Sequence, residues 1–64
     1  MKNRLKALRT KKGVSQNDLA LELFVSRQTI NSIENGKYDH SITLAKKLSL
    51  NFELPLDEIF IYED

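Results

Sequence analysis

Residues 16–36 constrain the fold more than any other stretch, because they contain two short segments with helical periodicity, separated by a corner of a few residues. Apolar side chains recur there at the three-and-four spacing that puts them on one side of a helix: Leu19, Ala20 and Leu23 in the first segment, Ile30 and Ile33 in the second. Ser15 and Ser26 stand directly before the two segments, where a hydroxyl can accept a hydrogen bond from a backbone N–H, and Asp18 completes a capping box with Ser15. Gly36 is expected to end the second helix. The sequence therefore predicts two capped helices, each with one side to bury.

The second segment is polar on the side opposite its isoleucines. Counting about 100° per residue from Arg27, one arc of roughly 0–140° holds Arg27, Asn31, Asn35, Gln28 and Ser32, and the isoleucines fall within roughly 240–300°. Two short capped helices joined by a corner have the layout of a helix-turn-helix. Arginine, glutamine and asparagine can read base edges, whereas a solvated helix face usually carries Glu and Lys pairs. The alternative is that Arg27 and Gln28 are simply good surface helix formers. We predict that Arg27, Gln28, Asn31 and Ser32 contact bases. Arg27 and Gln28 are the strongest candidates.

Several short runs also match a known pattern in one register. They are Val14-Ser15-Gln16, Asp18-Leu19-Ala20, Val25-Ser26-Arg27-Gln28-Thr29-Ile30 and Ile33-Glu34-Asn35-Gly36-Lys37. These runs resemble the Xre or Cro/repressor family of bacterial and phage DNA-binding domains, and the likeness extends from about Leu5 to Phe60. The resemblance implies an all-α, lambda-repressor-like domain of five helices with a central helix-turn-helix.

One position departs from the pattern of that family. The family's twenty-residue core has alanine, glycine and two aliphatic residues where this chain has Ala20, Phe24, Ile30 and Ile33. The glycine normally takes a left-handed backbone conformation, which costs a non-glycine residue roughly 1–2 kcal/mol. Phe24 must therefore accept that strain or alter the turn.

Length and composition indicate one small domain, residues 1–64. The chain has no cysteine, which excludes a disulfide and a thiolate metal site and fits a reducing cytoplasm. No stretch approaches the roughly 20 apolar residues of a membrane span, and the first residues lack the apolar block of a signal peptide. The net charge is only +1, but residues 1–13 hold six cations and no acid, whereas residues 53–64 hold five acids and no base. The basic end is compatible with phosphate contacts or with a solvated helix.

The resemblance also implies roles for residues around the two central helices. In the family, an arginine at the position of Arg9 pairs with the glutamate before Asn-Gly, which here is Glu34. Such a pair would tie the first helix to the recognition helix. The family's phosphate clamp corresponds to Ser15, Gln16, Asn35, Gly36 and Lys37. His40 follows in a polar loop, and we interpret it as a loop residue and not as a metal ligand.

Three further helices are expected outside the central pair. They are a first helix over about residues 3–12, closed by Gly13, a fourth over about 42–52, capped by Ser41, and a short fifth over 54–60, with Pro55 in its first turn.

The last residues, 59–64, include four consecutive β-branched or aromatic side chains, which favour a short extended segment that needs a partner. One available partner is the chain's own N-terminus, where Lys2 and Arg4 would oppose Glu63 and Asp64. The other is the same tail in a second copy around a two-fold axis. We favour a homodimer, with the alternative that the same residues cap the monomer's own core; its candidate contacts are Leu54, Leu56, Ile59 and Ile61.

These features predict a sequence-specific regulator of transcription that binds double-stranded DNA. We expect the helix beginning at Arg27 to enter the major groove, and a homodimer to repress by occupying a palindromic operator. The alternative is a protein-interaction module or antitoxin-like adaptor with the same fold, which Leu21 and Leu50 would suit if exposed. An enzyme is not expected, because the sequence lacks a Gly-rich phosphate loop and a carboxylate pair with an evident pocket. We expect no cofactor, metal, membrane contact or small-molecule substrate.

Overall fold

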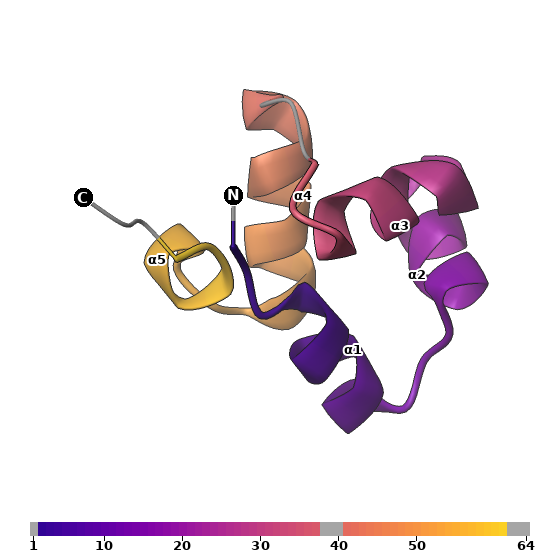
Figure 1. Ribbon diagram of the computed structural model, residues 1–64, viewed down its shortest axis with the longest axis horizontal. Coiled ribbons are helices and arrows are strands. Elements are labelled where there is room, and N and C mark those ends of the chain that lie inside the picture. The colour runs from indigo at the N-terminus through magenta and orange to yellow at the C-terminus, as the bar shows by residue number, and fades with distance from the viewer. Residues whose placement is uncertain (1, 38–40, 62–64) are drawn as a thin grey trace.

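The computed structural model describes residues 2–37 and 41–61, and within them the chain forms five helices (Figure 1). Their bounds are α1 Leu5–Lys12, α2 Gln16–Leu23, α3 Arg27–Glu34, α4 Ile42–Phe52 and α5 Leu56–Ile59. The expected all-α class and five-helix order are confirmed, and α4 has the predicted limits. The first and fifth helices are shorter than expected, because Arg4 and Pro55 stand at the caps before them. The prediction for His40 lies outside the described residues.

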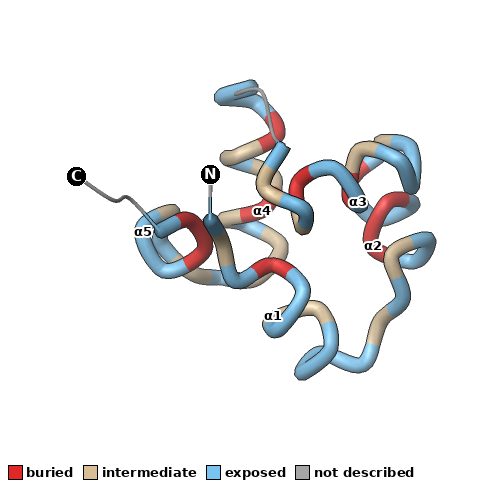
Figure 2. The backbone as a smooth tube through the Cα atoms, viewed as in Figure 1, coloured by how far each residue is buried: buried red, intermediate tan, exposed pale blue. Residues whose placement is uncertain are grey.

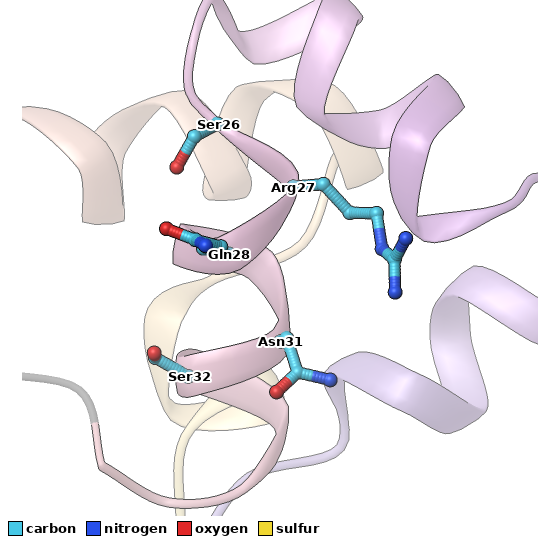
Figure 3. A pocket seen from close by; sticks show the side chains of 5 residues that line it. All are labelled: Ser26, Arg27, Gln28, Asn31 and Ser32. Carbon is cyan, nitrogen blue, oxygen red and sulfur yellow. The ribbon is translucent and has the colours of Figure 1, made fainter.

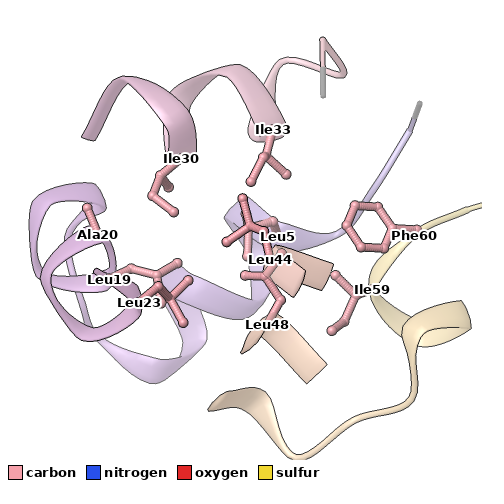
Figure 4. Packing of buried hydrophobic residues seen from close by; sticks show 10 residues of the cluster. All are labelled: Leu5, Leu19, Ala20, Leu23, Ile30, Ile33, Leu44, Leu48, Ile59 and Phe60. Carbon is pink, nitrogen blue, oxygen red and sulfur yellow. The ribbon is translucent and has the colours of Figure 1, made fainter. Parts of the chain in front are cut away.

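The five helices surround one apolar core, to which each contributes at least one buried side chain (Figure 4). The buried set is Leu5, Leu19, Ala20, Leu23, Ile30, Ile33, Leu44, Leu48, Ile59 and Phe60. These positions include the apolar side chains that define the inner sides of α2 and α3 in the sequence. The central pair therefore packs as its periodicity predicts, with α2 and α3 in direct contact.

Serine hydroxyls cap the N-termini of three helices. Ser15 accepts from the backbone N–H of Asp18 at 3.0 Å, and the Asp18 carboxylate accepts from the Ser15 N–H at 3.2 Å. Ser26 caps α3 through the N–H of Thr29 at 3.2 Å, and Ser41 caps α4 through the N–H of Leu44 at 3.3 Å. The predicted capping box and the predicted Ser26 and Ser41 caps are thus confirmed.

Four helices end in a residue with a left-handed backbone at or just after the cap, and only two of these residues are glycine. Gly13 and Gly36 have φ values of 80° and 75°, whereas Phe24 and Glu53 reach 58° and 55°. The N–H of Val25 donates to the carbonyl of Ala20 at 3.0 Å, which closes α2 in the usual left-handed manner. Phe24 therefore accepts the strained conformation and keeps the turn, with its side chain 88% exposed.

The C-terminal segment pairs with the N-terminus of its own chain. Arg4 N–H donates to Ile59 O and Ile61 N–H donates to Lys2 O, each at 2.8 Å. These bonds frame an isolated antiparallel bridge between Asn3 and Phe60, and the described residues contain no longer strand. The sequence left two partners open for the tail, and in the structure residues 59–61 pair with the N-terminus of the same chain. Glu63 and Asp64 lie outside the described residues.

The same pairing corrects one of the expected dimer contacts. Ile59 has no exposed surface, because it lies inside the core of its own chain. Its side chain therefore offers no surface to a second copy. Leu54 and Leu56 are half-buried against the core, and Ile61 is 37% exposed, so these three residues retain surface for another chain.

Candidate nucleic-acid interface

The two sides of α3 differ sharply in burial (Figure 2). Ile30 and Ile33 have no exposed surface. All four residues predicted to contact bases are exposed: Arg27, Gln28, Asn31 and Ser32. The arrangement on which the DNA-binding interpretation depends, with isoleucines inward and polar side chains outward, is therefore present in the fold.

The four exposed side chains and Ser26 line one open hollow of about 600 Å³ along the first two turns of α3 (Figure 3). In this view Arg27 and Asn31 project to one side of the helix, and Gln28 and Ser32 project to the other. The hollow is therefore bordered by two rows of polar side chains, and the two members of each row lie about one helical turn apart. Side chains of these types can hydrogen-bond to base edges in a major groove.

A second groove runs along the Gln28 and Ser32 side of α3 and reaches the start of α4. It is lined by Ser26, Gln28, Thr29, Ser32, Lys37, Ser41 and Leu44. Thr29 is not among the residues predicted for the surface, and the sequence predicts only capping roles for Ser26 and Ser41. The groove depends on where the start of α4 lies beside α3, which local sequence does not encode. These hydroxyls extend the polar surface beyond the predicted base-contacting residues.

A partly buried ion pair fixes the end of α3 to the rest of the fold. Arg9 Nε donates to Glu34 Oε2 at 2.7 Å, with the two side chains only 13% and 4% exposed. Arg9 Nη1 also donates to the carbonyl of Val14 at 2.9 Å, and Gln16 Nε2 donates to Glu34 Oε1 at 3.0 Å. One carboxylate thus holds α1, the start of α2 and the end of α3 together, in the pairing that the sequence resemblance implied for Arg9 and Glu34.

The five residues expected to contact phosphates lie in two segments, which the Glu34 carboxylate links. Ser15 and Gln16 lie at the start of α2, and the other three lie at or just beyond the end of α3. The backbone N–H groups of these three residues are already engaged, at 2.9–3.0 Å, in closing the helix: Asn35 to Asn31 O, Gly36 to Ile33 O and Lys37 to Ser32 O. These N–H groups therefore already serve the helix end. The exposed Lys37 side chain remains available to a phosphate.

A comparison with known protein families matches residues 5–59 of the chain to the HTH_3 helix-turn-helix family. The chain belongs to this family. The match includes α1 to α5 and the whole surface described above. It confirms the resemblance to the Xre and Cro/repressor type of helix-turn-helix that the runs around α2 and α3 indicated.

Relatives of this helix-turn-helix protein agree with that placement. An uncharacterised HTH-type transcriptional regulator of Methanocaldococcus jannaschii is 53% identical over 64 residues, which is all of this chain and 97% of the relative. The restriction-modification controller protein C.AhdI of Aeromonas hydrophila has a similar structure, with a TM-score of 0.78 and 33% identity over 89% of this chain and 86% of that one. A transcriptional regulator from Listeria innocua shares the fold, with a TM-score of 0.80 and 20% identity over all of this chain and 64% of that one.

The family and its relatives place this protein among DNA-binding transcriptional regulators, which are not enzymes. Among residues 2–37 and 41–61, no group of three or more histidine, cysteine, aspartate or glutamate side chains is arranged to hold a metal ion. In the same part of the chain, every helix is too short or too polar to cross a membrane.

Proposed function

We propose that this helix-turn-helix protein regulates transcription by inserting α3 into the major groove of a specific DNA site. The exposed polar side of α3, opposite fully buried Ile30 and Ile33, carries the proposal. A helix enters the major groove with its N-terminal residues against the base edges. Arg27 and Gln28, at the first two positions of α3, are therefore the leading candidates for base contacts, followed by Asn31 and Ser32.

Phosphate contacts on either side of α3 would fix its register on the duplex. The groups best placed for this role are the side chains of Ser15, Gln16, Asn35 and Lys37, beside Gly36, at the start of α2 and the end of α3. The bond from Gln16 to Glu34 keeps these two places together before DNA arrives. Preformed spacing of this kind would lower the entropy cost of binding.

Two copies would bind a palindromic operator, each reading a half-site about 34 Å from the other. The surface proposed to join them includes Leu54, Leu56 and Ile61 around α5, which keep exposed area after packing. Occupancy of such a site would repress transcription by blocking polymerase. Sedimentation at roughly tens of micromolar tests the dimer, and a monomer both with and without DNA would refute it.

Selection of bound sequences from a random duplex pool tests the proposed function directly. A sequence-specific dimer should recover a palindrome, and its affinity should fall steeply between about 50 and 200 mM salt as counterions are released. No binding to any duplex at about 50 mM salt would contradict the proposal. That result would instead favour a protein-interaction module or antitoxin-like adaptor, for which Leu21 and Leu50, exposed by 69% and 79%, offer contacts.

A further inference from the structure

Among the four predicted base-contacting residues, only Asn31 has its side chain hydrogen-bonded within the described part of the protein. Asn35 Nδ2 donates to Asn31 Oδ1 at 2.9 Å. Asn35 is the C-cap of α3, four residues after Asn31, so the two amides lie one turn apart on the same side. Both residues are exposed, and the bond therefore sits on the surface proposed to face DNA.

This bond changes what Asn31 can recognise. A free asparagine amide pairs with adenine in the major groove by accepting from N6 and donating to N7. The oxygen that would accept from N6 is the atom held by Asn35. The oxygen keeps a second lone pair, but the bond fixes the orientation of the Asn31 amide, so that Nδ2 projects to the same side of α3 as the Arg27 guanidinium (Figure 3).

The two rows of α3 consequently differ in chemistry. The row formed by Arg27 and Asn31 presents N–H donors, because a guanidinium has no acceptor and the bond to Asn35 holds the Asn31 amide with its nitrogen on the Arg27 side. The opposite row, formed by Gln28 and Ser32, keeps both donors and acceptors, since neither side chain has a hydrogen-bond partner among the described residues. A row of donors is complementary to a base edge that has only acceptors. Guanine, with N7 and O6, is that edge.

We propose that the Arg27–Asn31 row reads guanines, and that Asn35 is the positioning residue that gives Asn31 this preference. The inference rests on the proposed DNA-binding function and adds its base chemistry. Without the bond from Asn35, the Asn31 amide is able to rotate and pair with adenine through both of its polar groups. Asn35 thus selects between two bases by fixing the orientation of the Asn31 amide.

The test compares base preference, and not affinity alone, because loss of a phosphate contact at Asn35 weakens binding to every sequence equally. The duplex selected by the wild-type chain is resynthesised with each guanine of a half-site replaced by 7-deazaguanine or, as a base pair, by adenine. Equilibrium competition at fixed salt then gives the affinity ratio at each position. Asn31→Ala identifies the position that Asn31 reads, and Arg27→Ala identifies the one read by Arg27.

The expected result is a change at one position only. Asn35→Ala should lower the guanine-to-adenine ratio at the Asn31 position by at least about fivefold and leave the ratio at the Arg27 position unchanged. Asn35→Gln, which keeps an amide donor on a longer side chain, should restore part of the preference. Circular dichroism of the variants confirms that they remain folded.

Three outcomes would overturn the inference. Equal weakening on guanine and adenine sites in Asn35→Ala would mean that Asn35 acts on phosphates alone. Selection of adenine or thymine at the Asn31 position by the wild-type chain would contradict the donor-only reading. In both cases the protein still binds DNA specifically, so the proposed function survives. Failure of the wild-type chain to bind any duplex would overturn the function together with this inference.

Discussion

An arginine lies on each side of α3, and the two arginines have different roles. On the inner side, Arg9 is nearly buried and bonds to Glu34 and to a backbone carbonyl. On the outer side, Arg27 is exposed and has no hydrogen-bond partner within residues 2–37 and 41–61. A guanidinium whose donors are satisfied inside the fold contributes to stability, whereas one whose donors are unsatisfied is available to a ligand. Stability and recognition should therefore respond to different substitutions.

The largest expected effect is on the inner side, at Ile30. Truncation by Ile30→Ala should lower the free energy of unfolding by about 2–5 kcal/mol, because the residue is fully buried and its loss leaves a cavity. Thermal denaturation followed by circular dichroism measures the change. Ile42→Ala is the matched control, since Ile42 is 74% exposed at the start of α4 and should tolerate truncation. Equal losses in the two variants would contradict the assignment of the core.

Removal of Arg9 should have the next largest effect. Arg9→Ala leaves the Glu34 carboxylate partly buried without its cation, which should cost about 3 kcal/mol of unfolding free energy. A double-mutant cycle with Glu34→Gln separates the pairwise energy from the cost of the lone charge. Lys11→Ala is the control, because Lys11 lies exposed on the same helix and its truncation should hardly move the melting temperature. No destabilisation in Arg9→Ala would refute the structural role of the pair.

On the outer side, Arg27→Ala should affect DNA binding and leave stability unchanged within about 0.5 kcal/mol. We expect a loss of about 1–3 kcal/mol in binding free energy, with relaxed preference at one base position. Lys37→Ala is the contrasting variant: it should weaken binding to all sequences and reduce the salt slope by about one. Titrations of specific and random duplexes at several salt concentrations measure both effects. If the two variants behaved alike, the division between base and phosphate contacts would be wrong.

Sequence periodicity could predict which side of α3 is buried, because Ile30 and Ile33 repeat at helical spacing and only one side can meet the core. It could also predict the serine caps, which depend on residues three positions apart. The pairing of residues 59–61 with residues 2–4 was one of two open choices, since an extended apolar segment does not specify its partner. The bond between Asn35 and Asn31 escaped prediction because it depends on side-chain rotamers at the helix end.

The smallest expected effect concerns the turn that places α3 against α2. Phe24→Gly should raise the free energy of unfolding by up to about 1 kcal/mol, because glycine relieves a left-handed strain of about 1–2 kcal/mol. Two losses offset part of this gain. Glycine makes the unfolded chain more flexible, and the Phe24 ring gives up a contact with the Lys47 ammonium at 6.0 Å, worth about 0.5 kcal/mol at an exposed site.

Glu53→Gly separates these contributions, because Glu53 has the same left-handed backbone without a ring contact. Its gain in thermal stability should be equal to or larger than that of Phe24→Gly, and neither variant should change base preference. A marked fall in melting temperature for Phe24→Gly alone would show that the ring and Lys47, which also donates to the carbonyl of Leu23 at 3.2 Å, hold the turn together. In that case Phe24, although almost fully exposed, would contribute to stability through its contact with Lys47 of α4.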